Sequence, residues 1–160
     1  MAFATTDLCD LHGTDVRVVE PLFRDFGGLA SFAGPISTVR VLEDNVLVRA
    51  ALEEPGRGRV LVVDGGASLR TALLGDNLAA IAVQNGWSGI VVNGAVRDAR
   101  GLRASTVGIR ALATCPRKSG KKGEGERDQP VTFGGVTFTP GEHLYADEDG
   151  IVVSARALLP

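Results

Sequence analysis

Two continuous apolar runs dominate the hydrophobic pattern of the chain. RVLVVDGG (residues 59–66) and GIVVNG (residues 89–94) both end in polar residues and glycines. Strands that are buried on both faces of a sheet have this pattern. Between them, GDNLAAIAVQNGW repeats its apolar residues at helical spacing and reaches a terminator at Gly86. The pattern therefore predicts a strand, a helix and a second strand over residues 59–98, with the two strands as parallel neighbours.

Two further helices are predicted by capping residues that precede apolar positions spaced three and four apart. TTDLCDLHG forms a short opening helix that ends at Gly13, and DNVLVRAALEEPG forms a helix that stops at Pro55. The expected capping residues of the three helices, in chain order, are Thr5 or Thr6, Asp44 or Asn45, and Asp76 or Asn77. The expected buried faces of the second and third helices are Leu47, Ala50 and Ala51, and Leu78, Ile81 and Ala82.

The pattern changes towards the end of the chain. ISTVRVL (residues 36–42) and VGIRALATC (residues 107–115) are two more strands, and the second resembles the central pair. VTFGGVTFTPGEHLYADEDGIVVSA then alternates apolar and polar residues between Gly-Gly, Pro-Gly and Asp-Gly turns, as antiparallel hairpins do. Trp87 anchors the start of the strand that follows it. We expect an α/β fold, with a mixed sheet of central parallel βαβ units and C-terminal β-hairpins.

Length and composition narrow the class of protein. The 160 residues predict a single domain over residues 1–160, and the net charge of −2 leaves no footprint for direct nucleic-acid binding. PRKSGKK, at residues 116–122, precedes the acidic GEGERD, and we expect a mobile, solvated loop there. The chain has no membrane-length apolar run and no signal peptide, so we expect no membrane association. Cys9 and Cys115 suit packed free thiols in the cytoplasm.

Arg97 and Asp98 follow the second buried strand directly, where parallel α/β units bind their ligands. A helix that starts near Asp76 would bring its free N–H groups to the same edge of the sheet. Such a site combines an arginine for a carboxylate with two acids that can hold hydrated Mg²⁺. A metal beside a 2-oxo acid stabilises an enolate, as an aldolase or a β-keto acid decarboxylase requires. The amides expected to be free are those of Asn77, Leu78 and Ala79.

Simpler interpretations exist for each of these residues. Asp76 alone is most often a helix cap, and Arg97–Asp98 alone would form a surface turn. DGGAS lacks the full phosphate-loop pattern, and DEDG lacks the later Glu of a calcium loop, so a hairpin turn is favoured there. His12 and His143 have no metal-ligand partner at a suitable spacing, and we expect structural roles.

The chain resembles the RraA-like family, which includes the regulator of ribonuclease activity A and the 4-hydroxy-4-methyl-2-oxoglutarate aldolases. The resemblance covers nearly the whole length, through VVEPLFRDFGG, FAGPISTV, EDN, GRVLVVDGG, AVQNGWSGIVVNGAVRD and FGGVTFTPGEHLYADEDGIVV. The aldolase signature of the family is an Asp, twenty intervening residues and Arg-Asp. Asp76, residues 77–96 and Arg97–Asp98 match it.

The resemblance implies a swivelling β/β/α domain in a homotrimer, or a hexamer of paired trimers, with the site between subunits. It implies a class II retro-aldol cleavage that gives pyruvate, with oxaloacetate decarboxylation as a related activity. In that reading Arg97 and Asp76 are catalytic: Arg97 binds the oxygens of a small 2-oxo acid and steadies the enolate, and Asp76 orients water. Asp98 anchors Mg²⁺ or Mn²⁺. The residues implied to bind substrate are Gly75, Asp76, Asn77, Leu78 and Arg97.

The same resemblance implies a second kind of function. The amino-terminal LCDLHGTDVRVVEPLFRDFGG is closer to the regulators, which bind and inhibit ribonuclease E, whereas Asp98 is a residue that such regulators need not keep. A menaquinone methyltransferase is less favoured, because the sequence has no convincing glycine-rich adenosylmethionine loop. The longer aldolases carry a C-terminal Glu that reaches a neighbouring subunit's site, whereas this sequence stops at Pro160. The physiological substrate therefore stays open.

Overall fold

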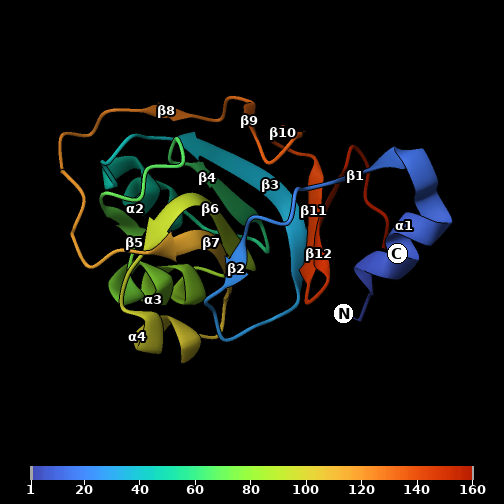
Figure 1. Cartoon of the computed structure of the whole chain (residues 1–160), viewed down its shortest axis with the longest axis horizontal. Coiled ribbons are helices and arrows are strands. Elements are labelled where there is room, and N and C mark those ends of the chain that lie inside the picture. The colour runs from blue at the N-terminus through green and yellow to red at the C-terminus, as the bar shows by residue number, and fades with distance from the viewer. Residues whose placement is uncertain (1, 160) are drawn as a thin grey trace.

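A computed structural model describes residues 2–159 and has the mixed α/β architecture that the sequence predicts (Figure 1). The strands are β1 (Val16–Val18), β2 (Arg24–Asp25), β3 (Phe32–Arg40), β4 (Val60–Asp64), β5 (Ala72–Leu74), β6 (Gly89–Val96), β7 (Gly108–Thr114), β8 (Glu126–Arg127), β9 (Val131–Phe133), β10 (Val136–Phe138), β11 (His143–Asp147) and β12 (Gly150–Ser154). The helices are α1 (Thr5–His12), the 3₁₀ turn η1 (Gly13–Asp15), α2 (Val46–Leu52), α3 (Asp76–Gln84) and α4 (Ala99–Arg103).

A ten-stranded mixed sheet connects most of these elements in the order β1-β12-β11-β3-β4-β6-β7-β2, with β5 beside β6 and β8 beside β3. β4 and β6 are parallel neighbours, as predicted, and β7 extends the parallel part. β3 joins the two halves of the sheet, because its first part pairs antiparallel with β11 and its second part parallel with β4. The predicted mixed sheet is therefore confirmed.

The central strands separate two apolar cores. Leu61 and Val63 of β4 belong to the core that the helices cover, and Val60 and Val62 belong to the core under the C-terminal hairpins. Alternate side chains of a strand point to opposite faces, so a strand covered on both sides needs apolar residues at every position. This arrangement explains the continuous apolar runs in the sequence.

Phe32 of β3 packs on a flat spot that two glycines create. Gly89 of β6 and Gly108 of β7 lie opposite each other in the sheet. A Cβ atom would lie 2.2 Å from the Phe32 ring if built on Gly89, and 1.9 Å from it if built on Gly108. Both positions therefore exclude any side chain, and the ring fills the space above them.

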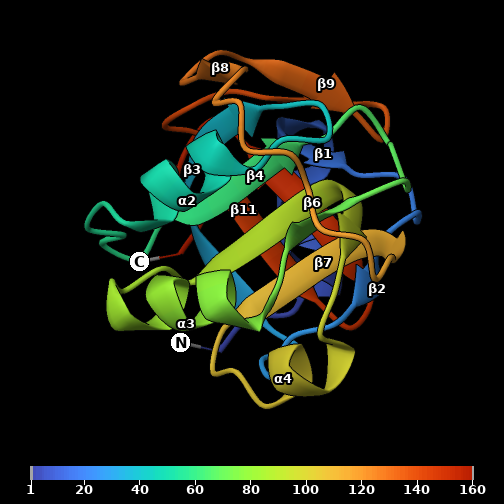
Figure 2. The same cartoon turned by 90° about the vertical axis from the view of Figure 1, so that its left-hand side faces the viewer.

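Three helices, α2, α3 and α4, lie on the same face of β4, β6 and β7 (Figure 2). The predicted face of α2 is wrong in part, because Ala50 is exposed and Leu47 is only half-buried. The residues that α2 buries are Val48, Ala51 and Leu52, and those that α3 buries are Leu78, Ala79 and Ala82. In a helix of two turns, two overlapping faces carry similar numbers of apolar residues, and packing on the sheet decides between them.

The predicted side-chain caps of α1 and α3 do not form. Ala4 and Gly75 occupy the two N-cap positions, and neither makes a side-chain cap. Instead, Thr5 donates hydrogen bonds from its backbone N–H and its hydroxyl to the two carboxylate oxygens of Asp147, both at 2.7 Å. A carboxylate from β11 therefore caps the start of α1, and local sequence carries no sign of this long-range contact.

The C-terminal hairpins and the anchor at the start of β6 agree with the sequence. β9 pairs with β10 across the Gly-Gly turn, and β11 pairs with β12 across the DEDG turn. The Pro-Gly turn is different, because β11 pairs with β3 and β12 rather than with the preceding strand. Trp87 is buried directly before β6, and its Nε1 donates to the carbonyl oxygens of Leu52 and Glu54, both at 3.2 Å.

No helix within residues 2–159 is both long and apolar enough to cross a membrane. Cys9 and Cys115 are free and half-buried, as the sequence suggests.

Candidate active site

Arg97 and Asp98 lie at the sheet edge where β5 and β6 end. β5 pairs with the end of β6, and the Arg97 N–H donates to the carbonyl oxygen of Leu74, the last residue of β5, at 2.9 Å. The next residue, Gly75, is the N-cap of α3. The structure thus brings together the start of α3 and the Arg97–Asp98 pair, which are separated by about twenty residues of sequence.

Gly75 allows a close approach between these two segments. A Cβ atom on Gly75 would lie 2.7 Å from Asp98 Oδ2 and 3.4 Å from Arg97 Cγ. The Asp98 carboxylate accepts a hydrogen bond from the Asp76 N–H at 3.2 Å. The absence of a side chain at Gly75 is therefore a packing requirement of the site.

Asp98 has a left-handed backbone, with φ 61° and ψ 48°, and forms the N-cap of α4. Asp tolerates this conformation better than most residues, yet it remains uncommon outside glycine. The sequence pattern does not predict α4, because five residues with a central Gly101 make a weak helical pattern. The left-handed turn sends the chain into α4 directly after Asp98.

The expected anion site at the start of α3 is smaller than predicted. The Ala79 N–H donates to the Gly75 carbonyl at 3.0 Å, so this amide is not free, and that part of the prediction is wrong. Asp76 also donates its N–H, to Asp98. Within residues 2–159, the N–H groups of Asn77 and Leu78 have no protein acceptor, so two amides remain for a ligand.

A cavity of about 120 Å³ opens beside these groups. Asp76 does not line it, since its carboxylate lies towards α4, where a Cβ atom on Gly101 would come within 2.8 Å of Asp76 Oδ2. The residues that line the cavity are Asn45, Arg49, Ala72, Gly75, Asn77, Leu78, Arg97, Asp98, Lys118, Ser119 and Lys121.

The basic loop that we expected to be mobile and solvated contributes three of these residues. Ser119 is buried, with 4% of its surface exposed, and its hydroxyl donates to the Ala72 carbonyl at 2.6 Å. The Lys121 ammonium donates to Asn45 Oδ1. The loop is solvated as expected, since all of residues 116–123 except Ser119 are exposed, but the expectation of a mobile loop is wrong, because hydrogen bonds hold the segment against β5 and the start of α2.

The lining residues that were not predicted as site residues are Asn45, Arg49, Ala72, Lys118, Ser119 and Lys121. From the sequence, Asn45 was predicted only as a possible helix cap, and the two lysines were predicted only as part of a charged loop. Four basic side chains, those of Arg49, Arg97, Lys118 and Lys121, line the cavity together with one acidic side chain, that of Asp98. The cavity therefore suits an anionic ligand.

The donor set fits a hydrated magnesium or manganese ion better than a zinc site. Residues 2–159 contain no group of three or more His, Cys, Asp or Glu side chains that could hold a metal. Mg²⁺ usually keeps several waters and binds through one or two carboxylates. Asp98 is exposed and uses one oxygen for the Asp76 N–H, which leaves the other oxygen available to a metal ion.

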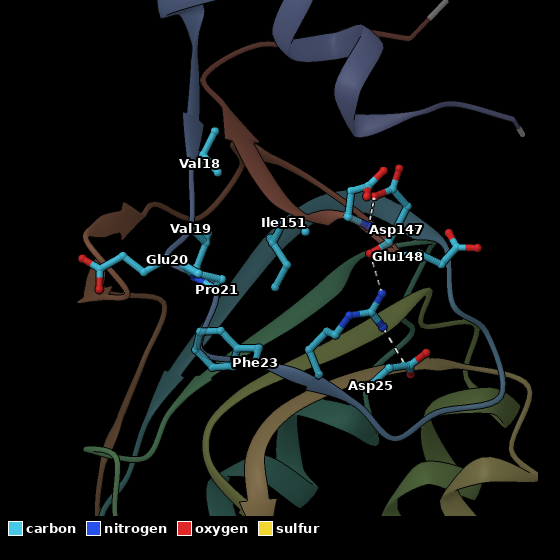
Figure 3. Close-up of a pocket in the computed structure, with 12 residues that line it drawn as sticks. Val18, Val19, Glu20, Pro21, Phe23, Asp25, Asp147, Glu148 and Ile151 are labelled. Carbon is cyan, nitrogen blue, oxygen red and sulfur yellow. Dashed lines mark hydrogen bonds and ion pairs between the residues drawn. The ribbon is translucent and has the colours of Figure 1, made fainter.

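A larger cavity, of about 530 Å³, lies elsewhere in the molecule (Figure 3). Val19, Phe23 and Ile151 form one side of it, and Asp25 and Glu148 lie on the other side. No residue that the sequence analysis selected as a site residue lines this cavity.

Arg110 is the basic residue of the larger cavity, and its Nη2 is already engaged by the protein itself, whereas its buried Nη1 has an ion-pair neighbour but no hydrogen-bond partner. Its Nη2 donates to the carbonyl oxygens of Ala30 and Asp147, at 2.5 and 3.0 Å, and its Nη1 lies 3.3 Å from Asp25 Oδ1. Burial lowers the pKa of Arg110, and the neighbouring carboxylates oppose that effect. The Asp147 carboxylate is likewise engaged, by Thr5. These contacts tie α1, β2 and β7 together and leave no evident catalytic pair.

Comparison with known proteins identifies the family that the sequence resembles. A sequence model described as Aldolase/RraA, RraA-like, matches residues 5–153. A protein of Burkholderia multivorans is 62% identical over 99% of both chains, and one of Alkalilimnicola ehrlichii is 58% identical over 99% of both. Both carry the provisional name 4-hydroxy-4-methyl-2-oxoglutarate aldolase.

A solved structure with the same fold has a different name. The RNA-processing inhibitor RraA from Thermus thermophilis is 52% identical, with a TM-score of 0.96, over 99% of this chain and 96% of that one. The likeness thus extends over the full fold. The names of the relatives disagree, because a solved structure from Geobacillus kaustophilus, 49% identical with a TM-score of 0.96 over 98% of this chain and 97% of that one, is named S-adenosylmethionine: 2-dimethylmenaquinone methyltransferase.

Proposed function

The chain belongs to the RraA-like family, and we propose that it is a divalent-metal-dependent class II aldolase. Its substrate would be 4-hydroxy-4-methyl-2-oxoglutarate, cleaved to two molecules of pyruvate, and oxaloacetate decarboxylation would be a second activity. The observation that carries this proposal is the placement of Arg97 and Asp98 against the start of α3 at Gly75, beside a basic cavity. The names of relatives 55–62% identical support it.

The substrate's 2-oxo acid end would lie between Arg97 and α3. The Arg97 guanidinium pairs with the carboxylate, and the N–H groups of Asn77 and Leu78 donate to its oxygens. Cleavage removes the proton of the 4-hydroxyl and breaks the bond between C3 and C4, and the electron pair passes into the pyruvate enolate. Arg97 stabilises that negative charge, and a proton added at C3 completes the second pyruvate. Asp76, whose carboxylate lies towards α4 outside the cavity lining, would act only through a bridging water that accepts the hydroxyl proton.

Asp98 would hold the metal ion, with Asp76 contributing through water. Mg²⁺ or Mn²⁺ supplies Lewis-acid stabilisation of charge on the 2-oxo oxygen. Gly75 keeps the Asp98 carboxylate close to the start of α3. We expect the working unit to be a cytoplasmic homotrimer, or a hexamer of two trimers, with the site at the subunit interface.

A coupled pyruvate-release assay tests the enzyme proposal, with 4-hydroxy-4-methyl-2-oxoglutarate and oxaloacetate as substrates, in Mg²⁺ and after chelation. Enzyme-free reactions with Mg²⁺ correct for spontaneous oxaloacetate decarboxylation. Arg97→Ala and Asp98→Asn should each lose about 100-fold or more of the rate, as for removed charge-stabilising groups. Arg100→Ala and Asp10→Asn, at exposed positions on α4 and α1, are the matched controls. An absence of metal-dependent turnover by the wild type would reject the enzyme, whereas turnover that survives both substitutions would reject only this site.

A second candidate is a protein regulator that binds and inhibits ribonuclease E. The full-length likeness to the RNA-processing inhibitor favours it, at 52% identity. A further solved relative, from Streptomyces coelicolor, belongs to the RNase ES inhibitor RraA family and is 32% identical. The test is ribonuclease E activity and pull-down in the presence of this protein. Inhibition without pyruvate release would favour the regulator, and the converse result would favour the aldolase.

A further inference from the structure

The segment of residues 117–123 is fixed at one end against β5. The Ala72 N–H donates to the Arg117 carbonyl at 2.8 Å, and the Ser119 hydroxyl donates to the Ala72 carbonyl at 2.6 Å. Ser119 also lies 3.3 Å from the hydroxyl of Thr71. These contacts hold the backbone on both sides of Lys118, so this lysine projects from a defined position.

The other end of the segment is fixed by Asp44. Its carboxylate accepts hydrogen bonds from the N–H groups of Lys122 and Gly123, at 2.7 and 2.9 Å. The Gly120 N–H donates to the Glu43 carbonyl at 2.8 Å. Asp44 is almost fully buried, with 4% of its surface exposed. The backbone around Lys121 is therefore also held in place.

The two lysines give the cavity more positive charge than one 2-oxo acid group requires. Lys118 and Lys121 are exposed and line the cavity together with Arg49, and the Lys121 ammonium is oriented by Asn45. Asp98 is the acidic residue among the lining side chains. One carboxylate and one oxo group would be satisfied by Arg97 and the start of α3, which leaves the positive charge of the lysines unmatched.

We propose that Lys118 and Lys121 bind the second carboxylate of a dicarboxylic 2-oxo acid and so select dianionic substrates over monoanionic ones. This inference rests on the proposed function for the position of the first carboxylate. The anchored segment of residues 117–123 is then a substrate-recognition element. A charge-assisted hydrogen bond to a bound carboxylate is strong enough to change affinity by about tenfold.

Binding of two non-cleavable acids tests the inference without requiring turnover. 2-Oxoglutarate has two carboxylates, and 2-oxopentanoate has a methyl group in place of the second one. We expect calorimetry on the full chain, with and without Mg²⁺, to show a preference of about tenfold for 2-oxoglutarate. Lys118→Gln combined with Lys121→Gln should remove the preference and leave the affinity for 2-oxopentanoate within about twofold.

Lys122→Gln is the matched control, because this lysine belongs to the same segment but does not line the cavity. It should keep the preference, as should Lys118→Arg combined with Lys121→Arg. A wild type without the preference, an unchanged preference in the double Gln variant, or an equal loss in Lys122→Gln would each overturn the inference. A lysine-dependent preference without any pyruvate release would reject the proposed function and leave the dicarboxylate site standing.

Discussion

Replacement of Asp44 by Asn should detach the segment of residues 117–123 from the core. The Asp44 carboxylate accepts the N–H of Val46 at 3.1 Å through Oδ1, and those of Lys122 and Gly123 at 2.7 and 2.9 Å through Oδ2. Hydrogen bonds to charged groups contribute about 1.5–3 kcal/mol each. Asn has one acceptor oxygen, so it can accept either the N–H of Val46 or those of Lys122 and Gly123, but not both. We therefore expect a loss of about 2–3 kcal/mol in the free energy of unfolding.

The pH dependence gives the same prediction a second readout. Burial raises the pKa of Asp44, but backbone hydrogen bonds, the largest from Val46, outweigh burial, so the pKa lies below its usual 3.8. A depressed pKa means that the carboxylate stabilises the fold above the unfolded value, and this stabilisation is lost as the pH falls through the folded value. The difference in unfolding free energy between wild type and Asp44→Asn should therefore be constant near neutral pH and shrink below pH 3.8.

Urea unfolding at several pH values and amide hydrogen exchange would measure both effects. Exchange at the N–H groups of Lys122 and Gly123 should accelerate in Asp44→Asn, and the exposed α1 variant Asp10→Asn should leave it unchanged. The reasoning is refuted if these two amides keep their protection in Asp44→Asn. A stability difference that persists undiminished at pH 2 would refute the assigned role of the carboxylate charge.

Three further substitutions test the packing and the site. Gly75→Ala places a Cβ atom 2.7 Å from Asp98 Oδ2. We expect about 100-fold slower pyruvate release with little change in thermal stability. An unchanged rate would contradict the proposed site. Gly108→Ala places a Cβ atom 1.9 Å from the Phe32 ring. Urea unfolding should show a loss of about 1–3 kcal/mol or more in the free energy of unfolding. An unchanged free energy would contradict the close packing. Trp87→Phe removes a donor to two carbonyl groups; a loss of about 1–2 kcal/mol is expected by the same measurement, and wild-type stability would show that water replaces the bonds.

The central sheet and the neighbourhood of the candidate site could be predicted from the sequence. The apolar runs that became β4 and β6 are local signals, since nearly every residue of both strands is buried. Parallel strands end at the same edge of a sheet, so the residues after β6 and those at the start of α3 had to be neighbours. The sequence therefore predicts that Arg97 and Asp76 lie near the same edge of the sheet, because this follows from the strand topology alone.

The orientation of individual side chains at this edge of the sheet was harder to predict from the sequence pattern. Asp76 proved to be the first residue of α3, with Gly75 as its N-cap. The carboxylate of Asp76 lies towards α4, a helix that the sequence analysis did not predict. A helical pattern shows that a helix forms, but which side chain faces the cavity depends on the packing of its neighbours.

Only the tertiary structure decided the role of the basic segment. By composition, residues 117–123 form a charged and glycine-rich loop, yet the contact between Asp44 and Lys122 spans 78 positions of sequence. The contact between Thr5 and Asp147 spans 142 positions. A buried carboxylate must find hydrogen-bond donors, but the sequence does not record which distant amides provide them. Local periodicity thus determined the strands, whereas the folded chain determined which polar groups meet at the cavity.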